Sequence, residues 1–458
     1  MTIFAKQILK IMTREERIGY ALSLASDTKV FKMGRGAARE APAIFKECFP
    51  GKKALLIADV FTWPAAGEMV FGFFEKAGIP IDKYIIEEKE FHAEWKYVEL
   101  VDGLLDSHPG HILVSVGSGV INDLCKLSSH HHEQSYLTIP TAASVDGYSS
   151  FGASITFEGA KQTFSCPAPV AILADIDVIA AAPKHMTAAG YADLAAKVPA
   201  GAEWMVADFV GTAPIHPEAW KVLQDYLDDF LAHPAEVAAG DPEAIADIFE
   251  GLTLSGIAMQ IARSSRPASC CDHLFSHILD MTEHRYNGKL QSHGFQVAIG
   301  TLTMCAVFDE LFKLDLTKLD VDACVAAWPT LESEQARALE LFKDFPAPRL
   351  GFDEITKKWN DPATVREQLT RLKAEWPELK ARLQGQVYSY EKMKSLLKAS
   401  GAPYEPEQIG VSREKLRSMF PLVQLMRFRF NVLDLGKRGG FYDAIVDPLF
   451  SKGGPFEI

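Results

Sequence analysis

The sequence predicts two domains: an α/β domain built on a mostly parallel sheet, followed by an all-α domain. In the first part of the chain, short apolar β-rich runs alternate with segments of helical periodicity, which is the pattern of βαβ units. From about Pro183, apolar residues recur at helical spacing and strand-like runs become scarce. This change puts the boundary near Ala182 and predicts domains of residues 1–182 and 183–458.

The individual elements follow from these runs in chain order. The N-terminal part is expected to contain strands at KKALLIAD (52–59), KYIIEE (83–88), HILVSVGSG (111–119), LTIPTAAS (137–144) and VAILADIDVI (170–179), with helices at 65–77 and 95–108. The C-terminal part is expected to be helical over 186–210, 241–262, 293–314 and 365–383.

Composition narrows the functional class. The chain has 458 residues, 48% of them hydrophobic, which is enough for more than one core. A net charge of -13 argues against general binding of nucleic acid or an anionic membrane. The first 24 residues predict an amphipathic helix rather than a signal peptide, and no apolar run is long enough to span a bilayer. Seven cysteines without CxxC spacing are typical of reduced thiols, so we expect a cytoplasmic protein.

A glycine turn follows one predicted strand directly. Gly117, Ser118 and Gly119 stand between the strand HILVSV and a helix, where backbone N–H groups and the helix N-terminus can hold a phosphate. The run is not the GxGxxG fingerprint of dinucleotide-binding proteins. Taken alone, it favours an ordinary strand-to-helix turn.

Asp59 ends the first strong strand. A carboxylate at a strand end can accept hydrogen bonds from a ribose diol and would repel a 2′-phosphate, which predicts NAD rather than NADP. The commoner alternative is an aspartate that caps a turn or helix.

The stretch SSRPASCCDHLFSH, residues 264–277, concentrates metal-binding side chains. His273 and His277 are four residues apart and share a helix face. Cys270 and Cys271 are adjacent, and neighbours on a helix point about 100° apart, so we do not expect both to face one ion. Each histidine can equally be a satisfied core or surface residue.

Two further candidate ligands lie outside this stretch. His293 begins another predicted helix, and Asp193 lies in a helix of small residues that leaves space for an ion. Asp193 can instead pair with Lys197. The cluster at residues 130–132 is more typical of a solvated helix end stabilised by the helix dipole.

Taken together, five ordered motifs resemble a known family. GSGVIND, IPTAASVDGYSS, MTAAGYADLAAK, SSRPASCCDHLFSH and HGFQVAIGT resemble the glycerol-1-phosphate dehydrogenases, in the superfamily of iron-containing alcohol dehydrogenases, glycerol dehydrogenases and dehydroquinate synthases. The resemblance runs from about Val30 to Leu435, and SSRPAS and TAASxDG favour the glycerol-phosphate branch. It implies a dehydroquinate synthase-like fold, with a Rossmann-like NAD(P)-binding domain and an all-α metal-binding domain.

The resemblance also implies roles for individual residues. Cofactor contacts are expected at Gly117, Ser118, Gly119, Asp123, Thr141, Ser144 and Ser150. The metal ligands are expected to be Asp193, His273 and His293, with Asp146 and His277 on the substrate side and Cys270 and Cys271 as bystanders. Arg266 is a candidate clamp for a substrate phosphate, and an ordinary salt bridge is its alternative.

The expected reaction interconverts dihydroxyacetone phosphate and sn-glycerol-1-phosphate. It would use NAD, with NADP as an alternative, and one divalent metal, with zinc favoured over nickel and iron. His277 would relay a proton, and the enzyme would be a homodimer or larger. The alternatives are another polyol or polyol-phosphate dehydrogenase, a dehydroquinate synthase-like lyase, and a binding protein without turnover. The chain departs from the family pattern in four places, which leaves the exact polyol substrate open. It has Gly-Ser-Gly where the family has three glycines, it has Ser149-Ser150-Phe151, it has the paired cysteines, and it has a long segment at about 344–390.

Overall fold

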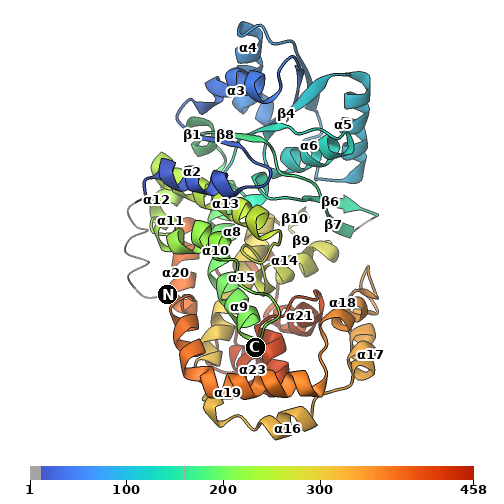
Figure 1. Cartoon of the computed structure of the whole chain (residues 1–458), viewed down its shortest axis with the longest axis vertical. Helices are drawn as coiled ribbons and strands as arrows, with labels where there is room; N and C mark the ends of the chain where they lie inside the picture. Colours follow the sequence, from blue (N-terminus) through green and yellow to red (C-terminus); the bar gives the residue numbers. More distant parts are fainter. Residues whose placement is uncertain (1–11, 159) are drawn as a thin grey trace. The chain divides into compact units, whose positions relative to one another are not determined.

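The computed structural model describes residues 12–158 and 160–458 (Figure 1). The chain forms two compact units. Unit 1 runs to Leu194 and takes in Pro217–Pro267 and Ala399–Gly401, and unit 2 comprises Ala195–His216, Ala268–Lys398 and Ala402–Ile458. The boundary near Ala182, which follows the change in secondary structure, stays a prediction. The N-terminal amphipathic helix is described as α2 (Arg14–Leu24), and residues 1–11 of that expectation lie outside the described residues.

Unit 1 is built on a six-stranded sheet with the order β1-β8-β5-β4-β2-β3, in which neighbouring strands pair in parallel. The strands are β1 (Val30–Gly34), β2 (Lys53–Asp59), β3 (Ile81–Ile86), β4 (His111–Gly117), β5 (Leu137–Pro140) and β8 (Ala171–Asp175). The predicted parallel α/β fold is confirmed, and β1 is a strand that the sequence does not predict.

Helices cover both faces of this sheet. They are α3 (Ala41–Cys48), α4 (Glu68–Lys76), α5 (Trp95–Ser107) and α6 (Gly119–His131). Along β2, Leu56 packs with α3 and α4, whereas Leu55 packs with α5 and α6. Figure 1 shows these two helix pairs on opposite sides of the strands. Burial on both faces explains why the strands are continuous apolar runs rather than alternating ones.

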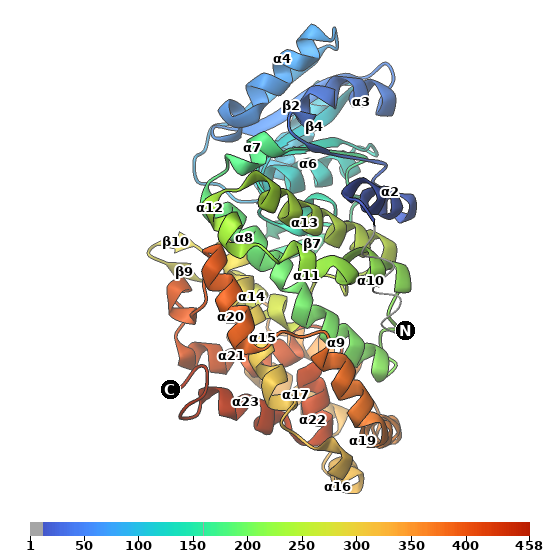
Figure 2. The same cartoon turned by 90° about the vertical axis from the view of Figure 1, so that its left-hand side faces the viewer.

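Unit 1 contains further helices. They are α7 (Ile176–Ala180), α8 (Lys184–Ala195), α10 (Pro217–Leu223), α11 (Leu227–Phe230), α12 (Pro234–Ala239) and α13 (Pro242–Ala262), with the short helices η1 (Ala37–Glu40), η2 (Trp63–Gly67), η3 (Asp146–Tyr148) and η4 (Gln224–Tyr226). α13 contacts α2, α7, α10 and η3 (Figure 2). Among the described residues, α13 is the one helix long and apolar enough to cross a membrane, and 89% of its apolar window is buried in the protein, as in a core helix.

Unit 2 is helical, as predicted. Its helices are α9 (Lys197–Phe209), α14 (Cys271–Met281), α15 (His293–Leu311), α16 (Val321–Ala326), α17 (Leu331–Phe342), α18 (Leu350–Lys358), α19 (Pro362–Gln384), most of α20 (Tyr390–Ser400), α21 (Arg413–Leu425), α22 (Val432–Gly439) and α23 (Tyr442–Phe450), with η5 (Leu316–Lys318) and η6 (Pro406–Ile409). Two hairpins were not predicted: β9 (Arg285–Tyr286) with β10 (Lys289–Leu290) in unit 2, and β6 (Ala153–Phe157) with β7 (Ala160–Phe164) in unit 1. α14 packs chiefly against α15.

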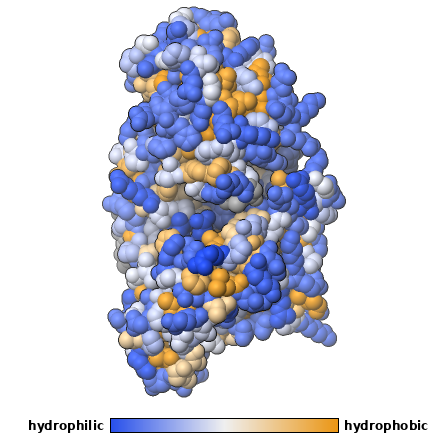
Figure 3. Space-filling model, turned by 90° about the vertical axis from the view of Figure 1, so that its right-hand side faces the viewer, coloured by the Kyte–Doolittle hydropathy of each residue, from blue (hydrophilic) through white to orange (hydrophobic). Residues whose placement is uncertain are grey.

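The surface visible in Figure 3 is mostly hydrophilic, as expected for a chain in which 23% of the residues are charged. On the face shown in Figure 3, hydrophilic residues predominate and hydrophobic residues form small separate areas. Exposed large hydrophobic side chains include Phe61 at 60% and Phe428 at 53%. Single exposed residues of this kind are normal on a folded protein.

Two helical glycines let α8 and α13 touch the loop that follows β5. A Cβ at Gly190 would lie 1.9 Å from the carbonyl oxygen of Ala143, and a Cβ at Gly256 would lie 2.1 Å from Oγ of Ser149. Both distances are far below van der Waals contact, so only a residue without a side chain fits. Gly190 belongs to the motif MTAAGYADLAAK, so close packing explains why the motif has a glycine at this position.

We expect Gly190→Ala and Gly256→Ala each to lower the free energy of unfolding by about 1–3 kcal/mol, because backbone or loop must move to admit the methyl group. Gly103→Ala in α5 is the control, since no atom lies within 4 Å of its added Cβ, and it should instead stabilise by about 0.5–1 kcal/mol. Urea denaturation followed by circular dichroism measures all three. Wild-type stability in both the Gly190 and the Gly256 variants would contradict this packing.

Candidate active site

The predicted glycine turn lies between a strand and a helix in unit 1. Gly117 ends β4, and Ser118 is the N-cap of α6 with φ -81° and ψ -173°. No side chain caps this helix, so its first N–H groups can receive an anion, which the helix dipole also favours. A Cβ at Gly117 would lie 2.6 Å from Cβ of Ile121, so the glycine permits close packing of strand and helix.

The end of the next strand adjoins this turn. Pro140 of β5 pairs with Gly117 of β4, and the N–H of Thr141 donates to the carbonyl oxygen of Gly117 at 3.1 Å. Thr141 and Ser144 are buried in the loop that follows. The carboxyl ends of parallel strands are where α/β sheets bind nucleotides, and the cofactor contacts of Thr141 and Ser144 stay a prediction.

Asp59 ends β2, as predicted, and caps a turn. Its Oδ1 accepts hydrogen bonds from the N–H groups of Phe61 and Thr62, both at 2.8 Å, and its own N–H donates to Oγ1 of Thr62 at 2.9 Å. Within the described part of the chain, Oδ2 makes no hydrogen bond. The turn-capping alternative is therefore present, and one carboxylate oxygen remains for another donor.

A buried lysine that the sequence analysis did not single out holds the loop carrying Ser150. Nζ of Lys126 donates to the carbonyl oxygens of Gly147, Ser150 and Gly152 at 2.7, 2.9 and 3.0 Å. Oδ1 of Asp123 lies 3.6 Å from the same Nζ. A lysine within the run Leu124–Leu127 of α6, whose other residues are apolar, is the signal that could have found it, because a buried ammonium requires such partners.

Asp146 and Asp193 are brought together in unit 1. Asp193 lies on α8 without solvent exposure, and its Oδ2 accepts the N–H of Asp146 at 2.9 Å. Oγ of Ser255 on α13 donates to Oδ2 of Asp146 at 2.9 Å. The sequence does not single out Ser255, although it directly precedes the contact glycine Gly256.

The two remaining predicted residues of unit 1 are also buried. Ser150 donates through Oγ to the carbonyl oxygen of Gly147 at 3.4 Å. Arg266 is 5% exposed, in the segment that follows α13, and its backbone N–H donates to Oγ of Ser264 at 3.2 Å. Its role as a phosphate clamp stays a prediction.

Three predicted histidines gather in unit 2. His273 and His277 lie one turn apart on α14, and His293 is the first residue of α15. The ring centroids of His273 and His293 are 5.3 Å apart, and those of His277 and His293 are 6.5 Å apart. The close packing of the two helices is helped by Gly300, where a Cβ would lie 2.1 Å from the carbonyl oxygen of Asp272.

One ring nitrogen of His273 is held by a buried carboxylate. Nδ1 of His273 bonds to Oδ2 of Asp272, and the fully buried Asp272 also accepts the N–H of Cys270 at 3.0 Å. A carboxylate that accepts one imidazole N–H orients the ring and leaves the lone pair on the other nitrogen.

A serine has the same effect at His293. Ser276 has one hydroxyl hydrogen, and it donates that hydrogen to Oε1 of Gln296 at 2.7 Å. Towards Nδ1 of His293, 3.1 Å away, the hydroxyl therefore accepts. This assigns the proton of His293 to Nδ1 and the lone pair to Nε2. None of Asp272, Ser276 and Gln296 was predicted.

Cys270 and Cys271 do not lie as a helical pair. Cys270 is the N-cap of α14, with φ -146° and ψ -131°, and the helix begins only at Cys271. The separation of about 100° between helical neighbours therefore does not apply. Both thiols lie with Glu203 of α9 in one buried cluster. Burial and the negative charge of Asp272 raise the pKa of Glu203 to about 7.

The chain is similar to known oxidoreductases along most of its length. The family of iron-containing alcohol dehydrogenases matches residues 32–183. The glycerol-1-phosphate dehydrogenase [NAD(P)+] of Halalkalibacterium halodurans is 32% identical over 285 residues, covering 60% of this chain and 70% of the relative. That of Halobacterium salinarum is 32% identical over 270 residues, covering 59% and 74%.

Solved structures share the fold. A probable glycerol dehydrogenase from Sinorhizobium meliloti superposes with a TM-score of 0.58 at 17% identity, covering 92% of this chain and 96% of that one. The NADH-dependent butanol dehydrogenase A of Thermotoga maritima gives a TM-score of 0.56 at 15% identity, with the same coverage of 92% and 96%. The resemblance inferred from the motifs is thus confirmed, and the chain belongs to the glycerol-1-phosphate dehydrogenase family of the iron-containing alcohol dehydrogenase superfamily.

Proposed function

We propose that this chain is a metal-dependent, NAD(P)-linked oxidoreductase that interconverts dihydroxyacetone phosphate and sn-glycerol-1-phosphate. The observation that carries the proposal is the pair His273 and His293, whose Nδ1 atoms bond to Asp272 and Ser276, in a chain whose curated relatives are named glycerol-1-phosphate dehydrogenase [NAD(P)+]. A small phosphorylated substrate suits a chain of net charge -13 only where a local cation receives the phosphate.

The metal would be held by Asp193, His273 and His293. Two imidazoles and one carboxylate suit zinc, which we favour, and also nickel or iron. The two histidines are fixed by Asp272 and Ser276, and Asp193 is a buried carboxylate whose Oδ2 already has one N–H donor. When bound, the ion polarises the carbonyl of the ketone and, in the reverse direction, lowers the pKa of the reacting hydroxyl.

The cofactor would bind at the carboxyl edge of the sheet in unit 1. The uncapped N-terminus of α6, at Gly117–Gly119, would receive the pyrophosphate, and Asp59 would receive the ribose. The loop residues Thr141, Ser144 and Ser150 would line the path towards the nicotinamide, with Asp123 acting through Lys126 and Ser154, which hold this loop. The bound cofactor supplies the hydride.

The remaining residues would handle proton and phosphate. His277, one turn from His273, would deliver the proton to the new hydroxyl oxygen. Asp146, held by Ser255, would orient a substrate hydroxyl. Arg266 would clamp the phosphate through its planar guanidinium. All seven cysteines are thiols, which supports a reducing cytoplasm as the location, and we expect a homodimer or larger assembly.

Dihydroxyacetone phosphate should be reduced with a kcat/KM about 10–150 times that for dihydroxyacetone, because a charged hydrogen bond to phosphate contributes about 1.5–3 kcal/mol. Arg266→Gln should remove most of this advantage. Arg263→Gln is the matched control, since Arg263 is exposed in the same segment. Steady-state assays on metal-replete enzyme measure kcat/KM for both ketones. A preference for the unphosphorylated ketone would contradict the proposed substrate and indicate a polyol dehydrogenase.

His293→Ala should lose the bound metal and the activity together while keeping the helical circular dichroism of wild type, because it deletes one of the proposed ligands. His131→Ala, at the end of α6, should keep both. Metal analysis and turnover are measured on the same preparations. Full occupancy with normal turnover in His293→Ala would exclude this ligand assignment.

Wild type should prefer NAD over NADP by about one to three decades in kcat/KM, because like charges about 4 Å apart repel by about 1–4 kcal/mol at surface-like dielectrics. Asp59→Asn should reduce this preference for NAD, since an amide oxygen can keep the turn capped without carrying a negative charge. Asp59→Gly should also reduce the preference for NAD, and it removes the turn cap. Asp177→Asn is the control, because it removes the charge of an exposed aspartate. Equal NAD-to-NADP ratios in wild type and Asp59→Asn would show that Asp59 is not at the ribose.

A further inference from the structure

The stretch SSRPASCCDHLFSH contains two thiols that the proposed reaction does not use. Cys270 and Cys271 are 5% and 0% exposed. Because Cys270 lies outside the first turn of α14, one sulfur atom from each cysteine and one carboxylate oxygen of Glu203 all lie within 4.8 Å of one another. The three residues belong to unit 2.

The spacing of these three atoms is compatible with a tetrahedral thiolate site. With metal–sulfur bonds of about 2.3 Å and metal–oxygen bonds of about 2.0–2.2 Å, ligand atoms on a tetrahedron lie about 3.5–4 Å apart. That separation falls within the 4.8 Å limit inside which the three atoms lie. Thiolate ligands select soft and borderline cations such as Cd²⁺ and Zn²⁺ over Mg²⁺ and Ca²⁺.

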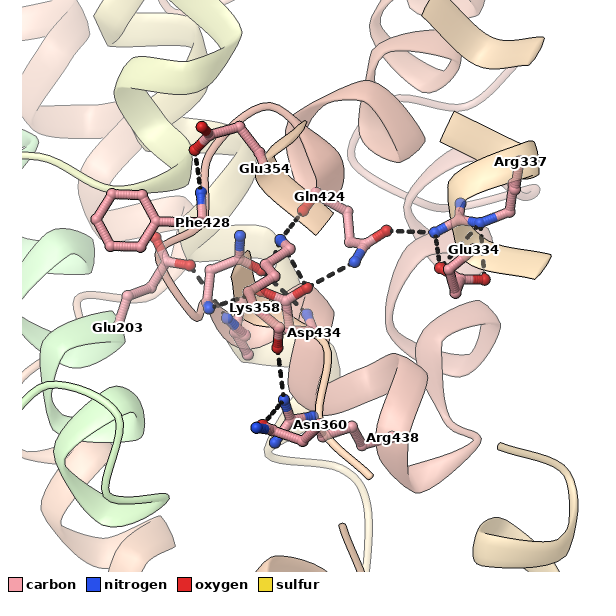
Figure 4. A network of polar contacts seen from close by, with 12 residues as sticks. Glu203, Glu334, Arg337, Glu354, Lys358, Asn360, Gln424, Phe428, Asp434 and Arg438 are labelled. Atoms are coloured by element: carbon pink, nitrogen blue, oxygen red, sulfur yellow. Dashed lines mark hydrogen bonds and ion pairs between the residues drawn. The ribbon is translucent and has the colours of Figure 1, made fainter. Parts of the chain in front are cut away.

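Glu203 is fixed in place as a ligand carboxylate would be. Its Oε2 accepts the N–H of Cys271 at 2.8 Å, and its Oε1 accepts the N–H of Val432 at 3.2 Å. These donors are the first residues of α14 and α22, so two helix N-termini face the carboxylate. Figure 4 draws Glu203 with the buried polar contacts around Asp434 in α22.

Two buried acids lie beside each other at the cluster. Within residues 12–158 and 160–458, Glu203 is paired with no lysine or arginine, and the fully buried Asp272 is a second acid beside it. The buried hydroxyl of Tyr442 interacts electrostatically with Cys271 and has no hydrogen-bond partner among the described residues. Burial disfavours the ionised form of these acids, and a divalent cation at this position would stabilise the ionised form.

We infer that Cys270, Cys271 and Glu203 form a second metal site, which binds one soft divalent cation of the Zn²⁺ or Cd²⁺ type in addition to the ion of the histidine site. Binding displaces one proton from each thiol and forms two metal–sulfur bonds and one metal–oxygen bond, with no change of oxidation state. The bound ion ties α9 to the first turn of α14, which also carries His273.

The test is a titration of metal-free protein with Cd²⁺, followed by the ultraviolet charge-transfer absorption that thiolate ligands give and imidazole or carboxylate ligands do not. In wild type the absorption should saturate by two equivalents, because the histidine site also takes up Cd²⁺, and excess Zn²⁺ should displace it. It should persist in His293→Ala, which removes only the other site, and in Cys324→Ser, which removes a thiol elsewhere in unit 2.

Three variants examine the cluster itself. Cys270→Ser with Cys271→Ser should abolish the absorption, and Glu203→Gln should weaken binding at least about tenfold. The single variant Cys270→Ser is a milder change that should keep the fold, because serine is a favoured N-cap residue. It should lower both the intensity of the ultraviolet absorption and the affinity for Cd²⁺. No saturable absorption in wild type, or an unchanged absorption in the double variant, would overturn the site and leave the cluster as hydrogen-bonded packing only.

Discussion

Two helices of unit 1 touch the loop after β5 at distances that only a hydrogen on Cα permits. Gly190 brings α8 against Ala143, and Gly256 brings α13 against Ser149. Asp193 and Ser255 lie close to these contact points in sequence, and both bond to Asp146. Lys126 fastens the same loop from α6 through three carbonyl oxygens. The loop that carries the predicted cofactor and substrate residues is thus held by three helices, and its geometry depends on how closely they approach.

In unit 2, a buried carboxylate and a buried hydroxyl each hold one ring nitrogen of a histidine. Asp272 occupies Nδ1 of His273, and Ser276 occupies Nδ1 of His293. Glu203 bonds the N-termini of α14 and α22, which fixes the start of the helix that presents His273. Removing any of these groups would leave the histidines in the chain but without a fixed ring orientation, which costs metal affinity.

Local patterns in the sequence predicted five of the six strands of the main sheet, the glycine turn and the histidine face, because each depends on residues close together in the chain. The alternation of β2, α4, β3, α5 and β4 is an example of such a pattern. Long-range partners could not be predicted in the same way: Ser255 and Asp146 are 109 residues apart. The two cysteines illustrate a different limit, since their geometry depends on whether α14 begins before or after Cys270, and helix ends are uncertain by one or two residues. The family resemblance supplied residue roles that no local pattern contains.

The stereochemistry of the product tests the proposed function most directly. Dihydroxyacetone phosphate is reduced with NADH, and the product is offered to a dehydrogenase specific for sn-glycerol-3-phosphate, the mirror-image compound. The proposed function predicts that one NADH is consumed for each glycerol phosphate formed and that the reporter enzyme does not oxidise the product. Oxidation of the product by the reporter, or a turnover that returns its hydride and consumes no NADH, would contradict it.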